Sequence, residues 1–68
     1  MDVAELMPVG NATAGDEIRV RGVWLRIIAV QGRFFLGRHI GTDVWTDDGR
    51  HFYARPECWR LITQKTAA

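Results

Sequence analysis

The sequence has few of the residues that build reactive or metal-binding sites. Cys58 is its single cysteine, so an internal disulfide and a four-ligand Cys/His zinc site are both excluded. The two histidines, His39 and His51, have no short-spaced partner with which to anchor a metal. A Gly-rich phosphate loop and a Gly-x-Ser-x-Gly nucleophile motif are also missing. We therefore expect no metal, no cofactor and no catalytic residues. The one enzymatic alternative that these absences leave is an oligomer whose subunits share an active site.

A targeting signal is missing as well. Residues 1–8 carry acidic side chains where a signal peptide has positive charge, and their apolar run is too short to span a bilayer. The lone cysteine fits a reducing compartment. These features predict a soluble, cytoplasmic protein with no membrane partner.

Overall charge is low but unevenly distributed. The formal net charge is +1, which excludes strong whole-molecule attraction to polyanions. Residues 17–42 nevertheless contain five arginines and one acidic residue, Glu17. Arginine favours planar, bidentate contacts with phosphate or carboxylate, although a GC-rich genome would produce the same bias. The five are Arg19, Arg21, Arg26, Arg33 and Arg38.

The apolar content is sufficient for a folded core. A chain of 68 residues that is 47% hydrophobic, with three Trp, three Phe and one Tyr, predicts one small domain. We divide it into an N-terminal stub and linker (1–14), a small β-barrel domain (15–62) and a flexible tail (63–68). In the stub, Val3, Leu6 and Met7 lie at helical spacing. This spacing predicts either one helical turn or a frayed tail.

The apolar stretch 23–30 has an ambiguous strand register. Its apolar residues are nearly continuous, so a two-residue period does not select one face. If Ile28 and Val30 point toward the core, Trp24 does too and Ile27 lies outside.

Turn signals divide the rest of the domain into short strands. Gln31-Gly32 is a hairpin candidate, and Gly37 suggests a bulge or a barrel corner within a strand. The further turns are predicted at Gly41-Thr42-Asp43, at Asp47-Asp48-Gly49 and at Pro56-Glu57-Cys58. Such spacing is typical of a small barrel or roll.

Three pieces of this pattern resemble the SH3-like small β-barrel superfamily. They are Gly15-Asp16-x-Ile18-x-Val20, Asp47-Asp48-Gly49 and Pro56-Glu57-Cys58-Trp59, within residues 15–62. The resemblance implies an all-β barrel or roll of five to six short antiparallel strands, with a one-turn helix before the last strand. Members of the superfamily bind nucleic acids, methylated residues or peptides, or form parts of larger complexes.

One branch of the superfamily is a plasmid-borne dihydrofolate reductase assembled from four small barrels. That branch carries a Val-Gln-Ile-Tyr signature, whereas the comparable stretch here is Arg50-His51-Phe52-Tyr53. Only Tyr53 matches, so no catalytic role is transferred.

The leading functional hypothesis is a non-enzymatic module that binds nucleic acid or a nucleoprotein. The five arginines named above would contact phosphates, and Phe34 or Phe35 would stack beside them. Because Phe34 and Phe35 are adjacent in a strand, one of them is exposed unless a partner or a bulge covers it. Alternatively, the arginines form a solvent face that pairs with acidic residues on neighbouring strands.

Two other hypotheses use the aromatic residues. Trp24, Trp45 and Tyr53 could line an aromatic groove for a cationic or proline-rich ligand, or they could simply fill the core, as we expect of Trp59. The chain could also be an assembly subunit or homo-oligomer that uses Phe34 and Phe35 as an apolar patch. A short chain of this kind fits a phage or mobile-element gene.

Overall fold

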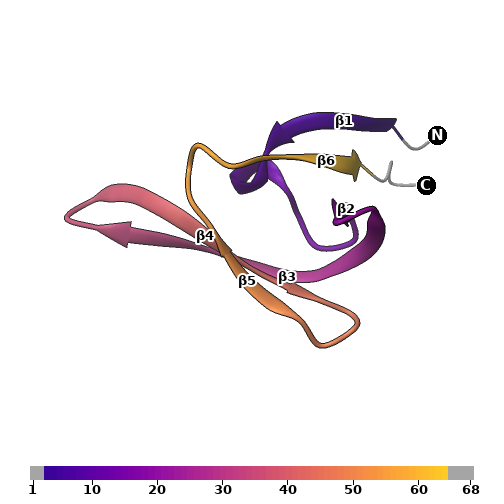
Figure 1. Ribbon diagram of the computed structural model, residues 1–68. Coiled ribbons are helices and arrows are strands. Elements are labelled where there is room, and N and C mark those ends of the chain that lie inside the picture. Colours follow the sequence, from indigo (N-terminus) through magenta and orange to yellow (C-terminus); the bar gives the residue numbers. More distant parts are fainter. Residues whose placement is uncertain (1–2, 65–68) are drawn as a thin grey trace.

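The computed structural model describes residues 3–64 and is all-β, as predicted (Figure 1). Six antiparallel strands form one sheet in the order β1-β6-β2-β3-β4-β5, and the sheet does not close into a complete barrel. The strands are β1 (Val3–Pro8), β2 (Glu17–Val20), β3 (Val23–Phe35), β4 (Arg38–Thr46), β5 (His51–Ala54) and β6 (Trp59–Gln64). A 3-10 turn, η1 (Val9–Asn11), follows β1.

The N-terminal segment is a strand, so the predicted helical turn or frayed tail is wrong. β1 pairs with β6 along its whole length, and Pro8 lies opposite Trp59 at the end of the pairing. A single helical turn is marginal by itself, so pairing with a distant strand overrides the local helical spacing. At the other end of the chain, Thr63 and Gln64 belong to β6, and residues 65–68 lie outside the described part.

The connection before β6 is a turn, and the predicted one-turn helix at this point is wrong. Its backbone is closed by one hydrogen bond, in which the Cys58 N–H donates to the Arg55 carbonyl oxygen at 2.9 Å. The tight turn expected at Pro56-Glu57-Cys58 is therefore present without helical structure.

β3 and β4 form a long hairpin that projects beyond the rest of the sheet (Figure 1). Its turn lies at Leu36 and Gly37, both with positive φ (52° and 77°), as the primed turns of tight hairpins require. The turn predicted at Gln31-Gly32 and the mid-strand bulge predicted at Gly37 are thus both wrong, because β3 continues through Gln31-Gly32.

The turn predicted at Gly41-Thr42-Asp43 is also wrong, because these residues lie inside β4. A Cβ atom at Gly41 would collide with the ring of Tyr53. Gly41 therefore provides room for a neighbouring side chain and does not turn the chain. In contrast, the turn predicted at Asp47-Asp48-Gly49 is confirmed, with φ of 88° at Gly49.

The register of β3 is the opposite of the one considered for stretch 23–30. Ile27 is fully buried, whereas Ile28 is 55% exposed and Trp24 is half-buried. A β-bulge between Ile27 and Ala29 then shifts the alternation by one residue, so Val30 again packs against the core. The regular alternation of buried and exposed side chains is therefore interrupted at this bulge.

The core lies between the two halves of the curved sheet. Ile18 on β2 and Ile62 on β6 are directly paired and fully buried, and Val44 on β4 closes the core from the other side. Val20, Phe52 and Cys58 pack against this cluster at its margin. These three residues are only partly buried, because the sheet does not close over this side of the core.

Candidate functional site

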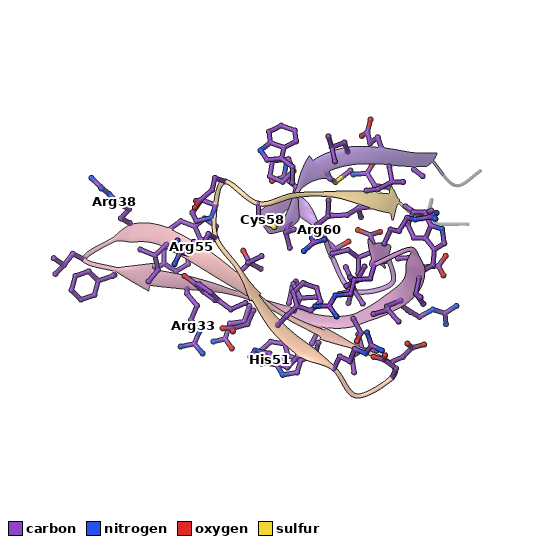
Figure 2. The ribbon with its side chains drawn as sticks, in the orientation of Figure 1. Arg33, Arg38, His51, Arg55, Cys58 and Arg60 are labelled. Atoms are coloured by element: carbon purple, nitrogen blue, oxygen red, sulfur yellow. The ribbon has the colours of Figure 1, made fainter. Side chains whose placement is uncertain are left out.

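The five arginines predicted to bind phosphate do not gather on one surface. Arg33 forms an ion pair with Asp43 on the outer face of the sheet, and Arg38 lies at the start of β4 in the projecting hairpin (Figure 2). The Arg19 guanidinium lies 5.8 Å from the centroid of the Trp24 ring. Arg26 is exposed on β3, opposite Glu17. Only Arg21, in the turn between β2 and β3, faces a hollow together with other arginines.

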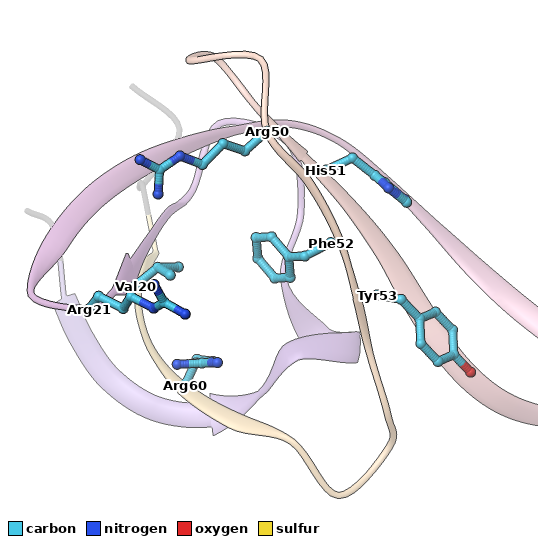
Figure 3. Close-up of a pocket in the computed structure, with 7 residues that line it drawn as sticks. All are labelled: Val20, Arg21, Arg50, His51, Phe52, Tyr53 and Arg60. Atoms are coloured by element: carbon cyan, nitrogen blue, oxygen red, sulfur yellow. The ribbon is translucent and has the colours of Figure 1, made fainter.

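That hollow lies on the open side of the sheet, between β5 and the ends of β2 and β6 (Figure 3). Its volume is about 420 Å³, and it is partly open to solvent. It is lined by Val20, Arg21, Arg50, His51, Phe52, Tyr53 and Arg60. Three of these are arginines and none is acidic, so the hollow is electropositive.

The three arginines of the hollow come from three different parts of the chain. Arg21 adopts a positive φ of 51° in the β2–β3 turn, Arg50 precedes β5, and Arg60 lies on β6. Within residues 3–64, neither Arg21 nor Arg60 forms an ion pair. The Arg50 Nε lies 2.8 Å from the Asp48 carboxylate, which orients this side chain at the rim. The donors of Arg21 and Arg60 thus remain available to a ligand.

The floor of the hollow is apolar. Phe52 and Val20 are half-buried and pack against the core cluster, and Phe52 lies opposite the fully buried Val44 on β4. Figure 3 shows the Phe52 ring projecting into the space enclosed by the sheet, toward the side occupied by Val20 and Arg21. The hollow therefore combines an aromatic surface with a cationic rim.

A polar cluster occupies the outer face of the sheet. Asp43 is only 2% exposed, and its carboxylate accepts hydrogen bonds from Arg33 and from His51, whose Nε2 lies 2.9 Å from Oδ1. The hydrogen bond from Arg33, together with that from His51, holds the pKa of Asp43 below its usual range despite the opposing effect of burial. Arg33 belongs to this outer cluster and does not line the hollow.

The residues of the predicted aromatic groove lie apart. Trp24 is half-buried beside Arg19, whereas the Trp45 ring stacks on His51 with centroids 4.9 Å apart. The Tyr53 hydroxyl donates to the Ile40 carbonyl oxygen at 2.7 Å, and the residue lines one edge of the hollow. Trp59, expected in the core, is 56% exposed on β6.

Phe34 and Phe35 are both exposed, at 66% and 65%. The alternation of side chains predicts that one of them is exposed, and the second is exposed because the hairpin extends beyond the rest of the sheet. The nearest ring to Phe34 is that of His39, with centroids 5.4 Å apart.

No protein-family model, curated protein or solved structure matches the chain. Among residues 3–64, no group of three or more His, Cys, Asp and Glu side chains is placed to hold a metal ion. The same segment contains no helix long and apolar enough to cross a membrane.

Three central residues of the hollow, Arg50, Phe52 and Arg60, were not predicted as site residues. One signal was available in the sequence. Arg50 and Phe52 are two positions apart, the spacing at which an extended chain directs side chains to the same side, and this spacing predicts a cation beside an aromatic ring. No local signal in the sequence predicts that Arg60 lies near Arg50 and Phe52. β6 and β5 are not neighbours in the sheet order, and only the curvature of the sheet brings them to the same hollow.

Proposed function

We propose that the protein is a non-enzymatic binding module, acting in the cytoplasm, that contacts nucleic acid through the hollow of Arg21, Arg50 and Arg60. The observation that carries this proposal is the convergence of three arginines on a hollow whose lining contains no acidic residue. Nucleic acids present a regular array of phosphates, and the planar guanidinium group binds phosphate through two parallel hydrogen bonds. A chain with a net charge of only +1 can bind such a partner through this concentrated site.

The composition of the hollow supports binding over catalysis. Its lining contains no Ser, Thr or Cys that could act as a nucleophile. The arrangement of the strands supports the likeness to SH3-like barrels, since β2 to β5 follow one another in the sheet and β6 returns beside β2.

Arg60→Ala is expected to weaken nucleic-acid binding and to reduce its salt dependence. Three contacts with single-stranded phosphates predict a log–log salt slope of about −2, and loss of one arginine lowers its magnitude by about 0.7. Fluorescence anisotropy with a labelled single-stranded oligonucleotide, between about 50 and 200 mM salt, measures both quantities.

The matched control for this experiment is Arg55→Ala. Arg55 is exposed and lies outside the hollow, so this variant changes the net charge equally without touching the site. It should retain the wild-type slope. Salt-independent binding, or equal losses in the two variants, would contradict the proposal.

The projecting hairpin supports a second candidate function, assembly with further copies of the chain. Its end exposes Phe34, Phe35 and Leu36, at 66%, 65% and 91%, and Ile40 at 41%. A cluster of exposed apolar side chains in one place is typical of an interaction surface. We propose that two copies would bury these side chains against each other.

Leu36→Asn is expected to abolish this self-association without harming the fold. Asn tolerates the positive φ of 52° at this position, and an Asn-Gly pair is favoured in such hairpin turns, so the fold should be kept. The substitution removes the apolar side chain of Leu36, which is 91% exposed. Light scattering from low to high micromolar concentration should show a rising mass for the wild type and a constant mass for the variant. Leu6→Asn, at an apolar residue 64% exposed on β1, is the control that keeps the wild-type behaviour. A wild-type chain that stays monomeric at high concentration rejects this candidate.

A further inference from the structure

We infer that the hollow accepts one unpaired nucleotide, with its base against Phe52 and its phosphates on Arg21, Arg50 and Arg60. This inference rests on the proposed function and specifies the substrate class as nucleic acid with an unstacked base. It distinguishes the site from a general phosphate-binding surface, which would accept duplexes and single strands alike.

The dimensions of the hollow fit a single base and its adjoining phosphates. A volume of about 420 Å³ lies within the usual range for small-ligand sites, about 300–1,000 Å³. A base inside a duplex is covered on both faces by its neighbours and enters such a space only after it has been unstacked and unpaired. A base in a single strand, a loop or a frayed end has already lost that stacking, so its entry costs less.

The aromatic surface lies at the centre of the hollow. Phe52 is half-buried, so its ring is fixed by the core while part of it remains exposed in the hollow. The other exposed rings are less suitable. Phe34 and Phe35 lie on the projecting hairpin, and Trp59 does not line the hollow. The Tyr53 hydroxyl is bonded to Ile40. A fixed ring loses little conformational freedom when a base stacks on it.

The polar groups of the hollow suit phosphate more than the edges of a base. Arg21 and Arg60 have no ion pair within residues 3–64, whereas Arg50 is oriented by Asp48 at the rim. No Asn, Gln, Asp or Glu lines the hollow, so it lacks the side chains that read the edges of adenine and cytosine. The guanine edge is read mainly by arginine, and we assign the three arginines of the hollow to phosphate. We therefore expect affinity for any unpaired base, with little preference among the four.

The test compares two single strands of equal length and charge. One is an oligothymidylate of about ten nucleotides, and the other has the same backbone with abasic sugars throughout. The wild-type protein should bind the thymidylate at least about fivefold more tightly, because only this strand can stack on Phe52. A duplex of the same length should bind no better than the abasic strand.

Phe52→Leu tests whether the preference depends on the ring. Leu keeps an apolar side chain against the core and removes the aromatic face, and thermal melting checks that the variant is folded. This variant should bind both strands equally, whereas Arg60→Ala should weaken both by the same factor. Equal wild-type affinity for the two strands would overturn the inference while leaving the proposed function intact. A preference that persists in folded Phe52→Leu would also overturn it. Failure to bind any strand would reject the proposed function itself.

Discussion

Ile27→Ala is expected to remove most of the stability of this domain. Truncating a fully buried Ile to Ala costs about 2–5 kcal/mol, because the apolar contacts are lost and a cavity remains. Ile27 is 0% exposed, and its backbone joins the two halves of the sheet. Its N–H donates to the Asp16 carbonyl and its carbonyl accepts from the Gly15 N–H, both at 2.8 Å. A chain of 68 residues has roughly 3–10 kcal/mol in total, so urea or thermal unfolding followed by circular dichroism should show a largely unfolded variant.

The adjacent residue provides the matched control. Ile28 is the same residue type, one position along β3, and is 55% exposed. Ile28→Ala should therefore shift the unfolding midpoint only slightly, by less than about 1 kcal/mol. If Ile28→Ala were the more damaging change, the register of β3 described above would be wrong and the register with Ile28 inside would be correct.

Asp43→Asn is expected to be the most damaging change among the polar residues. Asn fits the same space, but it cannot accept the charge-assisted hydrogen bonds that the Asp43 carboxylate takes from Arg33 and His51. The melting temperature at neutral pH should fall by several degrees. Asp48→Asn is the comparison, because Asp48 also pairs with an arginine, Arg50, but its side chain is more exposed than that of Asp43. A smaller loss in Asp43→Asn than in Asp48→Asn would contradict this ranking.

The effect of Asp43 on stability should depend on pH in a defined direction. The bond from Arg33 lowers the pKa of Asp43 in the folded state below its unfolded value, which is about 3.9. The stabilisation is therefore complete above about pH 4 and is lost as the pH falls through the folded pKa. Melting curves of wild type and Asp43→Asn should differ at neutral pH and converge in acid. A difference that persists unchanged at low pH would show that the charge of Asp43 is not its cause.

Local sequence signals predicted the strands and some of the turns. Alternation placed Ile18 in the core, where it is 0% exposed, and Asp-Gly placed the turn at Gly49. The glycine signal predicts the β3–β4 turn at Gly32, whereas the turn lies at Leu36 and Gly37. Gly41 lies inside β4, where the Tyr53 ring from β5 approaches it closely, and this neighbour cannot be identified from spacing along the chain.

The sequence by itself determined an all-β domain with an apolar core and an excess of arginine in residues 17–42. These properties follow from composition and from the two-residue period of a strand, both of which are local. Only the tertiary structure decided which arginines lie close together. Arg21, Arg50 and Arg60 meet because β6 returns beside β2 while the sheet stays open next to β5. Arg33 is not among them, because it lies on the outer face of the sheet, where it pairs with Asp43. Sheet curvature and pairing between distant strands depend on the whole chain, so no local pattern could have placed these residues.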